Sequence, residues 1–234
     1  MHARAAVSNH QGLRVGIIQP VIHKSTFSLV YIDPKNPTII DRMIYGQKLL
    51  LRPFRIEDLE RLHVYVNDVD VALPSGSLPL PVAVGAVVAG HEGPVAGYAS
   101  DAVVFAIEAA NRFIGTCALQ HFDAVARTCE MRVIIADHAF WGRGFGREIT
   151  ALLLNYAFRQ HNIHRIWLNV LGNNPRALRC FTICNFVEEG RLRQHIWSDG
   201  AYADLVFMGL LRSDWQTQQT TATAKVIEPE LVAG

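Results

Sequence analysis

Residues 130–158 read EMRVIIADHAFWGRGFGREITALLLNYAF, and this stretch contains the local signals that decide the fold. Glu130–Ile135 is rich in β-branched and apolar residues, as expected for a half-buried strand. Three glycines then alternate with larger residues in the run WGRGFG. Beyond them, apolar residues recur at helical spacing from Ile149 to Ala157, which predicts an amphipathic helix. The stretch therefore predicts a strand, a tight turn and a helix in succession.

The glycine turn is a candidate anion site because it leads directly into a helix. The first N–H groups of a helix have no partner within it, and the positive end of the helix dipole adds to them. Glycine lets the backbone approach a ligand with no Cβ in the way. We therefore expect a phosphate or pyrophosphate to bind here. The predicted contacts are Trp141, Gly142, Arg143, Gly144, Phe145, Gly146 and Arg147.

Two common phosphate-binding motifs do not fit this turn. No Lys-Ser or Lys-Thr pair follows Gly146, and Ile149 stands where a dinucleotide-binding turn would have its third glycine. A GxGxG turn is a weak signal by itself, and a tight turn without any ligand is the alternative interpretation.

Further motifs follow the turn and add specificity. They are Asn174-Pro175-Arg176-Ala177, Phe181, NFVEEGRLR (185–193), DGAYAD (199–204) and MGLL (208–211). In this order, and with the WGRGFG turn, they resemble the GNAT superfamily of acyl-CoA-dependent N-acetyltransferases. The resemblance is strongest to the branch of ribosomal-protein N-terminal and spermidine acetyltransferases, and it covers residues 48–215.

The resemblance implies the GNAT fold, an α/β (α+β) architecture with a mixed, mostly antiparallel sheet. We expect about six to seven strands, splayed at the cofactor-binding strand, and about four helices. Residues 48–212 would form this domain. Residues 1–47 would be an extension that supplies edge strands or a dimer arm, and residues 213–234 would be a disordered tail.

The predicted elements follow from local patterns. Leu73–Ala99 is rich in Pro, Gly, Ala and Val, and we interpret it as a mobile lid or loose helix that selects the acceptor; a surface insertion without function is the alternative. Elsewhere we expect strands at 48–54, 102–108, 112–120, 128–136, 165–170, 186–196 and 202–211, and helices at 55–67, after Gly146 and after Asn174.

Composition excludes several partners. The net charge of +1, from 22 basic and 21 acidic residues, gives no electrostatic footprint for nucleic acid or an anionic membrane. The apolar run in Leu73–Ala99 is too short to span a bilayer. The four cysteines have no metal-site spacing, so we expect no metal. With no signal peptide, the cytoplasm is the expected compartment.

The cofactor implied by the resemblance is acetyl-CoA. The backbone of Ile134, Ile135 and Ala136 would bind the pantetheine arm as an added strand, and an N–H near Val133–Ile134 would face the thioester oxygen. Asn174 and Phe181 would lie near the sulfur end of the cofactor. A purely structural helix cap is the alternative role for Asn174.

Proton transfer needs its own residues, because an alkyl ammonium has a pKa near ~10. Glu130 is the candidate catalytic base, with a structural salt bridge as the alternative, and His121 and His138 are weaker candidates. Phe181 stands where many GNAT enzymes have a tyrosine that protonates the leaving thiolate. The thiolate could leave unassisted or through water, Tyr202 or Cys184 could serve, or the protein could bind acyl-CoA with little activity.

The predicted function is an acetyl-CoA-dependent N-acetyltransferase. It would move an acetyl group by direct attack, in a ternary complex, to a primary amine on a small molecule or a protein N-terminus. A non-catalytic acyl-CoA-binding or regulatory protein is the main alternative, and a nucleotide-binding domain of another kind is a weaker one.

Overall fold

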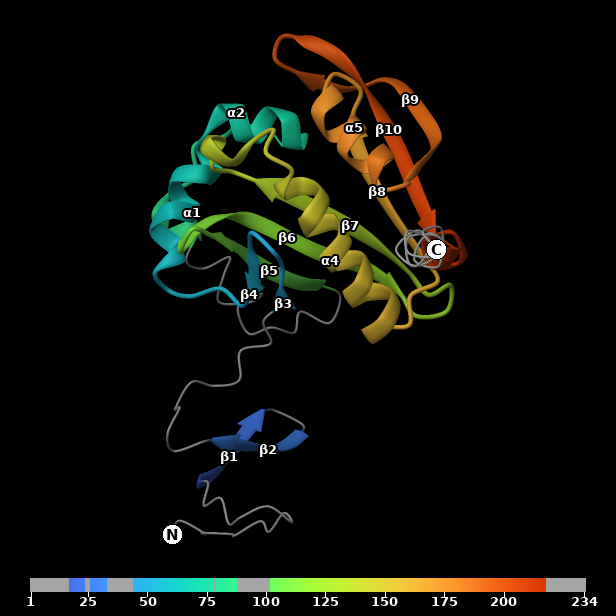
Figure 1. The fold of residues 1–234 in the computed structure, drawn as a ribbon. Coiled ribbons are helices and arrows are strands. Elements are labelled where there is room, and N and C mark those ends of the chain that lie inside the picture. Colours follow the sequence, from blue (N-terminus) through green and yellow to red (C-terminus); the bar gives the residue numbers. More distant parts are fainter. Residues whose placement is uncertain (1–16, 24–25, 33–43, 78, 88–101, 218–234) are drawn as a thin grey trace, which may run out of the picture. The chain divides into compact units, whose positions relative to one another are not determined.

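The computed structural model describes residues 17–23, 26–32, 44–77, 79–87 and 102–217 (Figure 1). The chain divides into two units, 1–42 and 43–234. In the first unit, β1 (Ile17–His23) pairs with β2 (Thr26–Ile32) in an antiparallel ladder. The extension, which was expected to supply edge strands or a dimer arm, thus contains a strand pair, and both roles stay predictions.

The second unit is built on one eight-stranded sheet in the order β3-β4-β5-β6-β7-β8-β10-β9. Every neighbouring pair is antiparallel except β7 and β8, which are parallel. The predicted mixed, mostly antiparallel sheet is therefore confirmed. The added strand is β3, which precedes the first predicted strand. The bounds are β3 Ile44–Tyr45, β4 Leu50–Arg52, β5 Ala102–Ala109, β6 Arg112–Asp123, β7 Thr128–Ile135, β8 Arg165–Leu171, β9 Val187–Ser198 and β10 Ala201–Leu211.

The sheet opens between its two parallel strands. β7 and β8 pair only at Thr128↔Arg165, Cys129↔Ile166 and Glu130↔Trp167. Beyond Glu130 the strands separate, although β7 stays paired with β6 as far as Ile135. This confirms the predicted splay, which begins after Glu130.

Helices cover both faces of the sheet. α4 (Phe145–Gln160) packs on one face, where Ile149 and Leu153 are fully buried in the main hydrophobic cluster. α1 (Asp58–Val66) and α2 (Val69–Ala72) belong to a second cluster that includes Leu62, Val71 and Ile134. Figure 1 shows α4 running across β6 and β7. Neighbouring residues on β7 therefore contribute to different clusters, as expected for alternating side chains.

α5 (Pro175–Ile183) begins where the sequence predicted, with Asn174 as its N-cap and Pro175 at its first position. Asn185 ends it in the left-handed region, at φ 66°. The first helix, predicted at 55–67, begins later, at Asp58. Ile56 precedes α1 and is 78% exposed, whereas Leu62 and Tyr65 are buried.

The segment expected to be a lid is described only in part. It begins with a 3-10 turn, η1 (Leu73–Ser75), and residues 84–87 are helical. Val87 is buried in the second cluster, and residues 88–99 lie outside the described part. Among the described helices, none has the length and apolar character needed to cross a bilayer.

The ordered domain extends beyond the predicted boundary at 212. Residues 212–217 are helical, and Trp215 is 6% exposed. Its ring lies 5.2 Å from that of Phe158 on α4. The sequence-based boundary was too early because one buried aromatic anchors an otherwise polar segment. Residues 218–234 lie outside the described part.

We predict that Trp215→Ala lowers the free energy of unfolding by about 3–5 kcal/mol, the range for a large aromatic removed from a core. Urea denaturation measures this change. Asp214→Ala is the control, because Asp214 is exposed on the same turn. Equal stability of the two variants would show that residues 212–217 do not belong to the folded unit.

Candidate active site

A cleft of about 500 Å³ lies along the end of β7, beyond its last residue pair with β8. Its wall is formed by the end of β7, the glycine turn with the start of α4, the exposed side of α5, and α2 with η1. The lining residues are Asp70, Val71, Pro74, Ser75, Val133, Ile134, Ile135, Phe140, Trp141, Gly142, Gly144, Phe145, Gly146, Arg147, Thr150, Asn174, Arg176, Ala177, Arg179, Cys180, Phe181 and Ile183.

The backbone amides of the glycine turn are available to a ligand. The first bond within this helix joins the N–H of Glu148 to the carbonyl of Gly144. Within the described chain, none of the amides of residues 142–147 donates a hydrogen bond. Unpaired amides of this kind at a helix start bind anions. The turn therefore has the free amides that the prediction requires, and anion binding at the turn stays a prediction.

The sequence explains why the turn adopts this shape. Gly142 and Gly144 have φ of 70° and 87°, a region that costs energy for residues with a Cβ. Between them and the helix, Phe145 is buried against Phe140 with ring centroids 5.1 Å apart. The buried aromatic pair holds the turn on the protein core, while the glycines add no side chains on its solvent side.

Arginines supply positive charge to the same wall. Arg147, Arg176 and Arg179 line the cleft, and the guanidinium of Arg176 lies 4.0 Å from the centre of the Trp141 ring. Arg143, which the sequence also placed here, is not a lining residue. Its side chain turns back to donate to the carbonyl of Ala139 at 3.2 Å, so its predicted contribution is limited to its amide.

The free edge of β7 forms the second wall. Strand groups alternate between neighbours, and the Ala136 amide bonds back to the Ile114 carbonyl at 2.8 Å. By alternation, the backbone groups of Val133 and Ile135 face the open side. The indole N–H of Trp141 already occupies the Ile135 carbonyl at 2.6 Å. Ala136 is 3% exposed and does not line the cleft, so its predicted amide contact was wrong.

Asn174 and Phe181 reach the cleft from α5. The Asn174 Oδ1 accepts the N–H of Ala177 at 3.1 Å, and its Nδ2 donates to the carbonyl of Pro74 at 3.2 Å. The capping role is thus confirmed, and the same side chain links α5 to η1. Phe181 is half-buried and packs edge-on against Phe186. A cofactor contact by either residue stays a prediction.

Two cysteines on α5 lie beside the anion site. Cys180 lines the cleft, and its Sγ lies 3.0 Å from where a Cβ on Gly146 would be. A hydrogen bond with Cys184 lowers the pKa of Cys180. The same hydrogen bond and burial raise the pKa of Cys184, which makes Cys184 a poor proton donor to a thiolate. Cys184 does not line the cleft.

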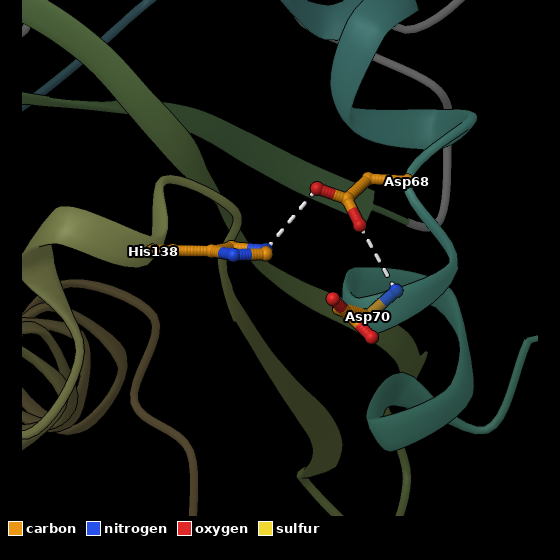
Figure 2. A group of neighbouring side chains, drawn as sticks. All are labelled: Asp68, Asp70 and His138. Atoms are coloured by element: carbon orange, nitrogen blue, oxygen red, sulfur yellow. Dashed lines mark hydrogen bonds and ion pairs between the residues drawn. The ribbon is translucent and has the colours of Figure 1, made fainter.

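An acidic group forms the rim of the cleft on α2. Figure 2 shows Asp68 between the other two residues: one oxygen accepts the amide of Asp70 at 2.9 Å, and the other lies 3.1 Å from Nε2 of His138. Ligand atoms of the three residues lie within 4.8 Å of one another, a spacing that could hold a cation. The N-cap of α2 already accounts for Asp68, and Asp70 alone lines the cleft.

Glu130 is at the closed end of the splay and does not line the cleft. It is 5% exposed. Its Oε2 accepts from Nδ1 of His121 at 2.7 Å and from Nε2 of Gln120 at 3.0 Å, and its Oε1 accepts from Asn169 at 3.4 Å. The predicted base is therefore buried in a network of donors.

The part of the chain that contains this splayed parallel pair, the free amides and the arginines matches a family model. The acetyltransferase (GNAT) domain model matches residues 48–187. The chain belongs to the GNAT acetyltransferase family. The match covers the sheet from β4 to the start of β9, including the glycine turn and α5.

Relatives of known name lie in the same family. A spermidine N(1)-acetyltransferase of Vibrio cholerae is 35% identical over 47% of this chain and 64% of its own length. An uncharacterized N-acetyltransferase p20 of Bacillus licheniformis is 24% identical over 74% of this chain and 97% of its own. A putative ribosomal N-acetyltransferase of Bacillus subtilis is 28% identical over 45% of this chain and 57% of its own length.

Solved structures agree with the fold. The crystal structure of spermidine N-acetyltransferase from Vibrio cholerae with CoA and spermine superposes with a TM-score of 0.67 at 27% identity. It covers 73% of this GNAT chain and 99% of that protein. A structure of the Vibrio cholerae enzyme described as dodecameric gives a TM-score of 0.63.

Sequence reasoning missed part of the cleft. The α2 and η1 residues Asp70, Val71, Pro74 and Ser75 come from a stretch with no motif, and only their position across from β7 brings them to the site. Arg176 and Arg179 could have been predicted, because the sequence shows basic residues at the start of a helix beside the expected anion site.

We predict that Gly144→Asp raises the dissociation constant for acetyl-CoA by at least about tenfold, or 1.4 kcal/mol. The new carboxylate would repel a diphosphate, and its Cβ would lie 3.5 Å from Nη2 of Arg147. Isothermal titration calorimetry measures the constant. Gly200→Asp is the matched control, since Gly200 also has a left-handed φ, of 75°, and lies outside the cleft. Equal affinity of the two variants for acetyl-CoA would show that the diphosphate does not bind at this turn.

Proposed function

We propose that this protein is an acetyl-CoA-dependent N-acetyltransferase that acts on a primary amine by direct attack in a ternary complex. The observation that carries the proposal is the set of unpaired amides at residues 142–147, beside an open strand edge at Val133 and Ile135. A diphosphate suits the first group and an extended amide-containing arm suits the second. Coenzyme A contains both, joined in this order.

Charge in the cleft favours separate places for cofactor and acceptor. The arginines that would meet the phosphates, Arg147, Arg176 and Arg179, come from α4 and α5. The acidic side chain of Asp70 comes from α2, with Asp68 behind it. An ammonium group is attracted to the acidic wall and repelled by the basic one.

A small cationic amine is therefore the proposed acceptor class, and spermidine is the first compound to test. The acidic rim supports this choice, as do the spermidine N-acetyltransferases among the relatives. An N-terminal amine of a protein is the second candidate, because a ribosomal N-acetyltransferase is also a relative. A homo-oligomer in the cytoplasm is the proposed form of the protein.

The competing function is binding of acyl-CoA without catalysis. Phe181 motivates it, because this side chain has no proton to give to the leaving thiolate. Cys184, one suggested substitute, keeps its proton too tightly for that role. Tyr202, the other, is 63% exposed on the β9–β10 hairpin, where it packs against Trp197. We propose that the thiolate leaves with a proton from water.

Two assays separate the functions. Calorimetry measures acetyl-CoA binding, and release of free thiol measures transfer to spermidine, spermine or N-terminal peptides. Thiol release above the hydrolysis rate, with an acetylated product by mass spectrometry, would support the transferase. Binding of acetyl-CoA with no transfer to any of these amines would favour the binding protein.

We predict that Phe181→Tyr raises kcat about tenfold and leaves KM for acetyl-CoA unchanged. The substitution supplies a hydroxyl to the cleft where the resembling enzymes have one. The gain is smaller than the roughly 100-fold or more of a general acid, because water already protonates the thiolate in our proposal. Phe181→Leu is the control for altered packing. A kcat unchanged by the tyrosine would mean that proton donation at this position is not a limiting factor.

A further inference from the structure

We propose that His121 is the general base of the acetyl transfer and that buried Glu130 is a positioning residue acting through it. The inference rests on the proposed function above. In the step that follows, Nε2 of His121 takes a proton from the acceptor amine, directly or through one water. The amine nitrogen bonds to the thioester carbon, the carbon–sulfur bond breaks, and water protonates the departing thiolate.

The geometry of the pair divides the roles. Glu130 has 7% of its side chain exposed and His121 has 59%, with Nδ1 and Oε2 2.7 Å apart. Gln120 and Asn169 also donate to this carboxylate. A carboxylate surrounded by donors accepts hydrogen bonds, so Nδ1 of His121 carries the proton. In the neutral ring of this exposed side chain, Nε2 is then the nitrogen without a proton, which is the form that a base requires.

The backbone holds His121 in an unusual conformation. It has a φ of 53°, in the left-handed region that non-glycine residues seldom occupy. The regular pairing of β6 with β7 is interrupted between Gln120 and Asp123. Such bulges redirect side chains and are frequent near active sites, and strained residues gather there as well. The irregularity turns the imidazole toward Glu130.

The pair is located where the splay begins and on the face that α4 does not cover. Glu130 is in the last residue pair between β7 and β8. Its neighbours Cys129 and Met131 are in the main cluster with α4, so strand alternation puts Glu130 on the opposite face. On β8, Asn169 lies between buried Leu168 and Val170, so the same alternation puts its side chain on the face of Glu130.

An amine can approach on this face. The His121 ring stacks on Trp167, with centroids 6.4 Å apart at 11°, and Trp167 neighbours Phe207 at 6.5 Å. Both aromatic rings are half-buried, and Asn169 is exposed. Aromatic faces attract ammonium groups. The surface formed by His121, Trp167, Asn169 and Phe207 therefore has the chemistry of a subsite for the reacting amine beside the base, and the Asp70 wall of the cleft would attract another ammonium group of a polyamine.

The first test removes the base and replaces it chemically. His121→Ala should lower kcat for spermidine acetylation by about 100-fold or more, leave the acetyl-CoA dissociation constant unchanged, and regain activity when imidazole is added. His164→Ala, on an exposed residue ahead of β8, is the control for losing a surface histidine. A kcat within threefold of the wild type, or an equal loss of acetyl-CoA binding, would overturn the assignment.

The second test separates positioning from direct action. If Glu130 acts through His121, Glu130→Gln lowers kcat in the wild type but has no further effect in the His121→Ala background. A further loss in the double variant would show that Glu130 acts on its own.

The third test needs no turnover and so distinguishes this inference from the transferase proposal. Nitrogen-15 NMR of the acetyl-CoA-bound protein should show the neutral His121 ring with its proton on Nδ1. A proton on Nε2 would overturn the inference even in an active enzyme. The absence of transfer to any amine, with the Nδ1 tautomer present, would contradict the transferase while supporting the geometry of the pair.

Discussion

The parallel strands β7 and β8 hydrogen-bond over only three residue pairs, and the rest of the site depends on this early separation. Unpaired backbone groups on a strand edge need another partner. Past Glu130, the backbone groups of Val133 and the N–H of Ile135 find none on β8, while the Ile135 carbonyl is bonded to Trp141. A ligand with amides of its own can take that place, as an added strand does. The splay therefore converts part of a sheet into a binding surface.

The opening is stable because elements next to β7 and β8 hold the two strands in place. β7 stays paired with β6, and β8 stays paired with β10 along its full length. α4 packs on β7 through a cluster in which Ile149 and Leu153 are fully buried. Asn174 joins α5 to η1 across the far side. A binding site held by packed elements needs little rearrangement when the ligand arrives.

Much of this site could be predicted from sequence because its signals are local. The glycine turn and the Asn174 cap each depend on residues adjacent in the chain, and each was found where expected. The helix end at Asn185 is local in the same way. The central strands were also foreseen, since apolar alternation and turn residues mark them. Resemblance to a family then supplied the mixed, mostly antiparallel sheet and its splay, which local patterns do not contain.

What could not be predicted depends on contacts between distant segments. Nothing in the α2 sequence indicates that Asp70 faces the glycine turn. Ala136 was misplaced because its amide bonds to Ile114, a pairing that only the register of β6 reveals. Trp215 was assigned to a tail because its polar neighbours hide one buried ring. The orientation of His121 depends on a bulge that no residue type in this stretch predicts.

The central claim is that free amides at residues 142–147 bind the diphosphate of coenzyme A. Nitrogen-15 amide shifts of the full chain, titrated with coenzyme A and in parallel with pantetheine, test it directly. Pantetheine has the arm but no diphosphate. The account predicts that coenzyme A shifts the amides of residues 142–147 strongly and that pantetheine shifts only those of Val133 and Ile135. Turn amides that do not respond to coenzyme A would contradict it.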